Sequence, residues 1–125
     1  MATAVELLRP HLDRPIVAAG AFVRRDGRWW RPRALLAVTA DAVFLFEAGA
    51  RWTPTRMLAA WGRATVGVEV THAPPASPPL RGTWLAAPLL VGPTVRLLPV
   101  GAPALVLHGV DAAAAAVAAE LLAGG

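Results

Sequence analysis

The sequence contains no cysteine, no lysine and no tyrosine, and its only serine is Ser77. The absence of cysteine excludes a disulfide framework and thiolate chemistry. The absence of tyrosine excludes a phenolic general acid. Ser77 lies in Ala-Ser-Pro-Pro and not in the Gly-x-Ser-x-Gly elbow of serine hydrolases, so we do not expect it to be a nucleophile.

Metal and nucleotide motifs are missing as well. The histidines His11, His72 and His108 show neither HxxxH nor HExxH spacing, and the eight carboxylates are scattered singly. No GxGxxG or GxxxxGK[ST] sequence is present for phosphate binding. We therefore expect no enzymatic activity, no cofactor, no metal site and no small-molecule substrate.

No apolar run is long enough to cross a bilayer. The longest weakly charged stretch, Trp84 to Leu107, is interrupted by prolines and by Arg96, whereas a spanning helix needs about 20 unbroken apolar residues. The N-terminal MATAVELLRPHLD contains Glu6 and lacks the basic region of a secretory signal. These features predict a cytoplasmic protein, and a length of 125 residues predicts one domain, 1–125.

Every basic side chain is arginine, and the net charge is +4 at pH 7. A positive balance favours anionic partners through long-range attraction, but it identifies none of them. Since alanine, glycine and proline are also abundant, the exclusive use of arginine is typical of a GC-rich coding bias.

About seven short strands are predicted, centred on an apolar hairpin. In ALLAVTADAVFLFE, the strands Leu35–Thr39 and Ala42–Glu47 flank a tight turn that contains Asp41. Further strands are predicted at 16–24, 65–72, 83–87, 94–100 and 104–108, while 57–61 is a strand or one helical turn. Gly20 indicates a bulge or a close backbone approach. Pro54 predicts an irregular segment over 51–55.

A helix is predicted on each side of this β-rich region. Val5, Leu8 and Leu12 share one face of a helix over 2–12, which Pro10 ends or kinks. Asp111 caps a closing helix over 112–122. The order predicts a mostly β (α+β) fold with an N-terminal helical segment (1–15), an antiparallel barrel or sandwich (16–110) and a C-terminal helix (111–123).

The central hairpin is apolar on both faces, because Leu36 and Val38 alternate with Leu35 and Ala37. A free-standing small barrel exposes one face of its strands to water. The second face therefore needs a cover, either the helix that carries Leu8 or a second copy of the chain. The intramolecular cover is the simpler explanation.

The same hairpin carries a resemblance to a known family. Residues 36–39 (LAVT) followed by 41–46 (DAVFLF) resemble the hairpin of bacterial pleckstrin-homology-like and GRAM-like domains. The segments 57–61 and 66–70 and the helix over 111–122 are similar to the strands and closing helix that follow in those domains. The resemblance implies a partly open β-barrel capped by its C-terminal helix. It also implies a non-enzymatic binding or scaffolding module that engages a protein partner or forms a homo-oligomer.

The most unusual segment is Arg24–Arg33, RRDGRWWRPR, which surrounds an Asp-Gly turn signal. It combines positive charge with amphipathic indoles, and its candidate ligand-binding residues are Arg24, Arg25, Arg28, Trp29, Trp30, Arg31 and Arg33. The resemblance implies that such residues reach the phosphates of anionic phospholipid headgroups, so peripheral membrane association is the alternative function.

The competing interpretation of this segment is purely structural: the tryptophans cover the outer face of the barrel and the arginines solvate a hairpin tip. We prefer it, because arginine is the default base of this chain. Since no further aromatic platform follows, nucleic acid is not an expected partner.

Overall fold

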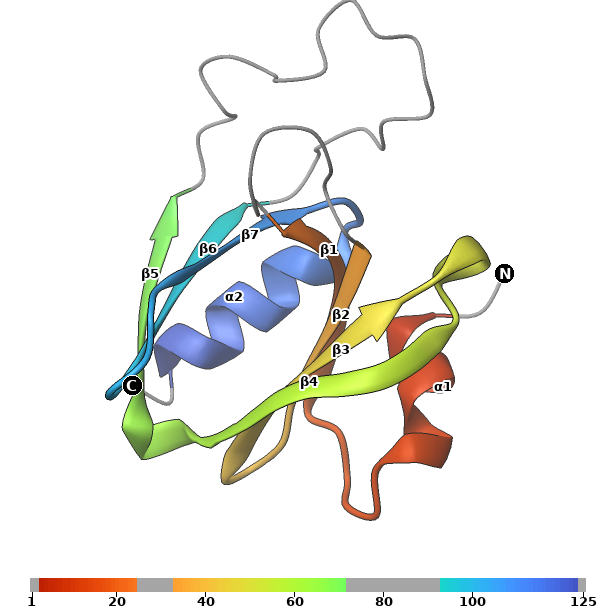
Figure 1. Ribbon diagram of the computed structural model, residues 1–125, viewed down its shortest axis with the longest axis horizontal. Helices are drawn as coiled ribbons and strands as arrows, with labels where there is room; N and C mark the ends of the chain where they lie inside the picture. The colour runs from red at the N-terminus through yellow and green to blue at the C-terminus, as the bar shows by residue number, and fades with distance from the viewer. Residues whose placement is uncertain (1–2, 25–32, 72–92, 124–125) are drawn as a thin grey trace, which may run out of the picture.

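The computed structural model describes residues 3–24, 33–71 and 93–123, which are mostly β (Figure 1). The helices and strands are α1 (Ala4–Leu8), β1 (Ala18–Arg24), β2 (Arg33–Val38), β3 (Ala42–Ala48), β4 (Pro54–Gly62), β5 (Val66–Thr71), β6 (Thr94–Pro99), β7 (Leu105–Gly109) and α2 (Ala113–Ala123). Three short 3-10 helices join them: η1 (Arg9–His11), η2 (Ala50–Trp52) and η3 (Arg63–Thr65).

The seven strands form one antiparallel sheet in the order β4-β3-β2-β1-β7-β6-β5. Strands β4 and β5 follow each other in the chain across η3, yet they are the two outer strands. The sheet therefore curves round α2, as Figure 1 shows. Among the described strands β4 and β5 do not pair with each other, so the sheet is not closed.

Alternate residues of the central hairpin enter two separate apolar clusters. Leu36 and its neighbours on one face pack with Val117 and Leu121 of α2. Leu35 and its neighbours on the other face pack with Ala4 and Leu8 of α1, and full burial of one such leucine side chain stabilises the fold by about 1.5–3 kcal/mol. The two helices thus lie on opposite faces of the sheet. The prediction that the N-terminal helix covers the second face of the hairpin is confirmed.

Gly20 allows α2 to approach the sheet closely. A Cβ atom at this position would lie 3.0 Å from both the Cα and the N atom of Ala114, and 3.2 Å from the carbonyl carbon of Ala113. These are backbone atoms of the first turn of α2, which cannot move aside as a side chain does. The expected close backbone approach at Gly20 is confirmed.

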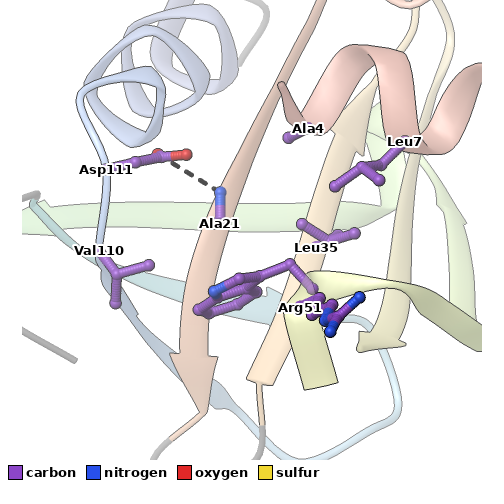
Figure 2. A pocket seen from close by; sticks show the side chains of 8 residues that line it. Ala4, Leu7, Ala21, Leu35, Arg51, Val110 and Asp111 are labelled. Carbon is purple, nitrogen blue, oxygen red and sulfur yellow. Dashed lines mark hydrogen bonds between the residues drawn. The ribbon is translucent and has the colours of Figure 1, made fainter. Parts of the chain in front are cut away.

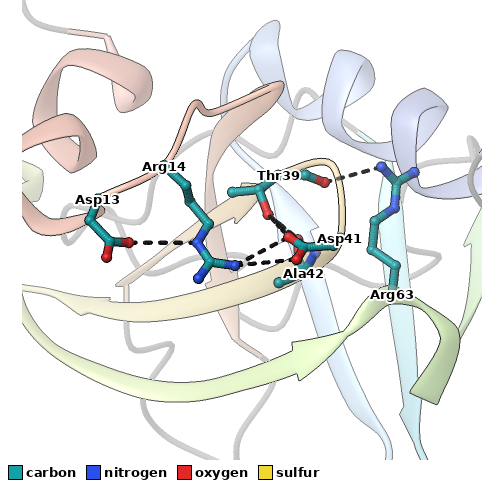
Figure 3. Close-up of polar contacts among 6 residues, drawn as sticks. All are labelled: Asp13, Arg14, Thr39, Asp41, Ala42 and Arg63. Carbon is teal, nitrogen blue, oxygen red and sulfur yellow. Dashed lines mark hydrogen bonds and ion pairs between the residues drawn. The ribbon is translucent and has the colours of Figure 1, made fainter.

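The turn between β2 and β3 is fixed by polar contacts (Figure 3). The Thr39 backbone N–H donates to the Ala42 carbonyl at 2.9 Å, and the Thr39 hydroxyl donates to Asp41 Oδ1 at 3.2 Å. Arg14 donates to the same carboxylate oxygen at 3.2 Å, and Arg63 Nη1 donates to the Thr39 carbonyl at 3.1 Å. Asp41 is therefore the turn residue that the sequence predicts.

The two helices begin at side-chain caps. Thr3 and Glu6 form a capping box at α1, in which each side chain accepts from the backbone N–H of the other, both at 3.2 Å. The predicted helix over 2–12 is too long: α1 ends at Leu8 and η1 carries Pro10, whose missing N–H ends regular α-helix. Asp111 accepts from the Ala114 N–H at 3.0 Å, as expected of the cap of α2.

The segment after β3 agrees with its prediction in part. Arg51 and Trp52 are irregular, since both have φ of 60° within η2, but β4 begins at Pro54, so the predicted irregularity is wrong for residues 54–55. Proline is tolerated there because it is the first residue of an outer strand and need not donate to the ladder. Residues 57–61 belong to β4 and are a strand, while the predicted strand at 83–87 lies outside the described residues.

Candidate ligand-binding site

The strand ends that flank residues 25–32 and 72–92 lie at one end of the sheet. Val23 of β1 lies opposite Arg33 of β2 on one side and opposite His108 of β7 on the other. Thr94 of β6 likewise lies opposite His108 on one side and opposite Thr71 of β5 on the other. Arg33 also lies opposite Ala48 at the end of β3, so η2 follows at this same end.

Positive charge gathers at this end of the sheet. Glu47 of β3 faces two arginines: its Oε1 lies 3.2 Å from Arg56 Nε and its Oε2 lies 3.8 Å from Arg24 Nη2. Two further cations are Arg51, within η2, and Arg33, which lies against Gly49 and Trp52. We call the set Arg24, Arg33, Glu47, Arg51, Trp52 and Arg56 the basic end.

Two of the seven predicted site residues fall within the described residues. Arg24 has a side chain that is 16% exposed and paired with Glu47. Arg33 Nη1 donates to the Gly49 carbonyl at 3.4 Å, and its guanidinium carbon lies 5.5 Å from the centroid of a Trp52 ring. A cation above an indole face is stabilised by the ring quadrupole. Both arginines are thus held against the sheet by contacts within the chain.

The other five predicted site residues, Arg25, Arg28, Trp29, Trp30 and Arg31, lie outside the described residues. Their role in ligand binding stays a prediction. Only their place in the chain is given, between the two described strand ends Arg24 and Arg33.

The backbone of η2 is in an uncommon conformation. Arg51 and Trp52 both have φ of 60°, in the left-handed region that disfavours residues with a side chain. Non-glycine residues in such conformations cost about 1–3 kcal/mol each and cluster at binding sites and switch regions. Arg51 and Trp52, which carry this conformational strain, are also two of the residues that line an apolar pocket.

An apolar pocket of about 530 Å³ opens beside η2 on the face of the sheet that α1 covers. Figure 2 shows Ala4 and Leu7 of α1 on one side, Ala21 and Leu35 of the sheet at the centre, and Val110 on the far side. We call it the Trp52 pocket, and its lining residues are Ala4, Leu7, Ala21, Leu35, Arg51, Trp52, Val110 and Asp111.

The two charged groups of the Trp52 pocket differ in how they are engaged. Asp111 Oδ1 accepts from the Ala114 N–H at 3.0 Å and from the Ala21 N–H at 3.4 Å, so its charge serves the start of α2. The exposed Arg51 guanidinium makes no hydrogen bond or ion pair with any other described residue. The pocket therefore offers an apolar wall beside one available cation.

Sequence reasoning missed Arg51, Trp52 and Arg56 as site residues. One signal was present: Trp52 follows Arg51 directly, as Trp29 follows Arg28. What the sequence does not carry is the register that places η2 beside Arg33, which lies 18 residues earlier in the chain.

The chain matches no protein-family model, and it matches no curated protein. In the described ranges, no helix is long and apolar enough to span a bilayer. The same ranges contain no group of three or more histidine, cysteine, aspartate or glutamate side chains placed to share a metal ion. The geometry of the basic end is therefore the ground for a functional proposal.

Proposed function

We propose that this chain is a non-enzymatic binding module of the pleckstrin-homology-like class that engages a protein partner at its basic end. The observation that carries the proposal is the Trp52 pocket, a concave and mostly apolar site with one available cation at its wall. Pockets with apolar walls and few polar groups are the usual form of a binding site. Tryptophan and arginine are also the residues that contribute most to binding energy at protein interfaces.

A partner other than a second copy is favoured by the way the apolar surface is covered. The hairpin face that called for a cover is packed by α1, with Leu8 fully buried. A homo-oligomer is therefore not needed to shield that face from water. A separate apolar site is left beside it at η2, which a different protein can enter.

Selection of displayed peptides tests this proposal. A random peptide library would be selected on the wild-type chain and, in parallel, on Leu7→Glu, which places a carboxylate in the wall of the pocket at a half-buried position. We expect peptides with a bulky apolar residue to be enriched on the wild type and to lose binding to the variant. Enrichment of no peptide, or equal binding to both proteins, would contradict the proposal.

The second candidate function is peripheral binding to anionic phospholipid headgroups. It is favoured by the position of Arg51 and Arg56, which lie at the same end of the sheet as the strand ends that flank residues 25–32. Each basic residue near an anionic membrane contributes about 1 kcal/mol, and the attraction weakens with salt.

Co-sedimentation with vesicles tests this second function. The wild type would be compared with a Trp29/Trp30/Arg31/Arg33 quadruple alanine variant on neutral and anionic vesicles, at low and moderate salt. Membrane binding requires that the wild type pellets with anionic vesicles alone and that the variant does not. If neither protein pellets, the membrane function is excluded.

A further inference from the structure

The chemistry of the partner follows from three features of the Trp52 pocket, and this step rests on the proposed function. The first feature is size and polarity. A pocket of about 530 Å³ has room for a bulky side chain, and six of its eight lining residues are apolar: Ala4, Leu7, Ala21, Leu35, Trp52 and Val110. An aromatic or branched aliphatic side chain gains most by leaving water for such a wall.

The second feature is the charge at the pocket wall. Arg51 is exposed and has no ion-pair partner in the described part of the chain, while Arg33 and Arg56 lie in the same basic end. The nearby carboxylate of Glu47 is paired with arginines, and that of Asp111 accepts two backbone N–H groups. Among the described residues the site is therefore short of negative charge, and a carboxylate supplied from outside meets a planar, permanently charged guanidinium.

The third feature is the backbone at Arg51. Its φ of 60° and ψ of 20° are costly for arginine and would be natural for glycine. Strained residues of this kind persist only where the surrounding structure enforces them, and they cluster at binding sites and switch regions. Glycine at position 51 would adopt this backbone without strain, but it would provide no guanidinium at the pocket wall.

We infer that the partner of the Trp52 pocket is an acidic protein segment in which aspartate or glutamate directly flanks one aromatic or branched aliphatic anchor residue. The anchor side chain fills the apolar pocket, and the flanking carboxylate pairs with Arg51. The adjacency follows because Arg51 itself lines the pocket that would hold the anchor, so a carboxylate directly beside the anchor lies close to this cation.

Three synthetic peptides test this inference with the full chain. The first carries one phenylalanine between two aspartates, the second has asparagine in place of both aspartates, and the third has alanine in place of phenylalanine. Dissociation constants would be measured by isothermal titration for the wild type, for Arg51→Gly and for Arg14→Ala. Arg14→Ala is the matched control, because it removes the same charge near Asp41 at the opposite end of the sheet.

We expect the Asp-Phe-Asp peptide to bind the wild type about tenfold more tightly than the asparagine peptide, as one charge-assisted contact predicts. The alanine peptide should not bind measurably. Arg51→Gly should reduce the affinity for the Asp-Phe-Asp peptide to that for the asparagine peptide without lowering the melting temperature, since glycine suits the backbone there. Arg14→Ala should bind as the wild type does.

Equal affinities for the aspartate and asparagine peptides, or an unchanged affinity of Arg51→Gly, would overturn the inference. In that case neutral peptides selected by display would still support the proposed function, so the two failures are distinguishable. Displacement of the Asp-Phe-Asp peptide by vesicles of anionic phospholipid, but not by neutral vesicles, would assign the site to a membrane surface and would also overturn the inference.

Discussion

At the scale of single residues, backbone conformation and function are in conflict at Arg51. A left-handed arginine is less stable than a left-handed glycine, yet the cation is positioned at the wall of the Trp52 pocket. We expect Arg51→Gly to raise the free energy of unfolding by about 0.5–1 kcal/mol, the relief of strain being partly offset by the freedom of glycine in the unfolded chain. Urea denaturation measures this change. A loss of stability would show that the Arg51 side chain holds the fold rather than a ligand.

Gly20 is the opposite case, because the backbone of α2 lies so close that no side chain fits at this position. We expect Gly20→Ala to lower the free energy of unfolding by about 1–3 kcal/mol, because its Cβ would press on the backbone of α2 at 3.0 Å. Gly67→Ala is the matched control: its Cβ would meet Leu98 side-chain atoms at 3.4 Å or more and should change stability by less than about 1 kcal/mol. Equal thermal stability of the two variants would contradict the close packing of α2 on β1.

At the scale of elements, Arg63 ties three parts of the chain together. Its guanidinium donates to the Thr39 carbonyl at 3.1 Å, to Glu120 Oε1 at 3.1 Å and to the Glu120 carbonyl at 2.7 Å, with 13% of the side chain exposed. A cation near the end of a helix also complements the helix dipole. The residue therefore joins η3 and the β2–β3 turn to the C-terminal turns of α2.

We expect Arg63→Ala to lower the free energy of unfolding by about 2–4 kcal/mol, because three charge-assisted hydrogen bonds are lost at a largely buried site. The comparison is Arg14→Ala, whose pair with Asp41 is exposed and should contribute less than about 1 kcal/mol. Thermal denaturation followed by circular dichroism compares the two. The interpretation of Arg63 as a clamp fails if both variants unfold at the same temperature.

The capping box makes the stability of α1, which packs on the apolar cluster around Leu35, sensitive to acid. Hydrogen bonds from Thr3, the backbone N–H first and the side chain next, hold the pKa of Glu6 below its ordinary value. Folding thus favours the ionised carboxylate, so its stabilising effect is present above the unfolded-state pKa. It disappears as the pH falls through the folded-state pKa.

We therefore expect the amide protection of α1, measured by hydrogen exchange, to fall only below the ordinary titration range of glutamate. Glu6→Gln keeps a side-chain oxygen at the cap and should flatten this pH dependence. An NMR titration that places the pKa of Glu6 at or above its ordinary value would contradict the cap.

Most elements were predictable from local sequence, because each is specified by a few neighbouring residues. The alternation over 65–72 predicts β5, and the pattern of 35–46 predicts the hairpin between β2 and β3. The start of β4 at Pro54 was not predictable, because proline is acceptable there only on an outer strand. Edge position is a property of the whole sheet rather than of the local sequence.

At the scale of the whole molecule, the site depends on long-range register. Four arginines gather at one end of the sheet only because strands far apart in sequence lie in a particular alignment. Sequence reasoning selected the arginine-rich segment 24–33 by composition, and of its members Arg24 and Arg33 belong to the basic end that the structure describes. The Trp52 pocket could not be found in that way, because its walls come from α1, β1, β2, η2 and the residues after β7.

The most direct test of a partner site at the basic end is an NMR measurement of intermolecular nuclear Overhauser effects between the Asp-Phe-Asp peptide and the full chain. We predict contacts from the phenylalanine ring to the Trp52 indole and to the methyl groups of Leu7 and Leu35. Contacts instead to the exposed Val100 and Leu122, beside another cavity that opens at η3 and the end of α2, would contradict it.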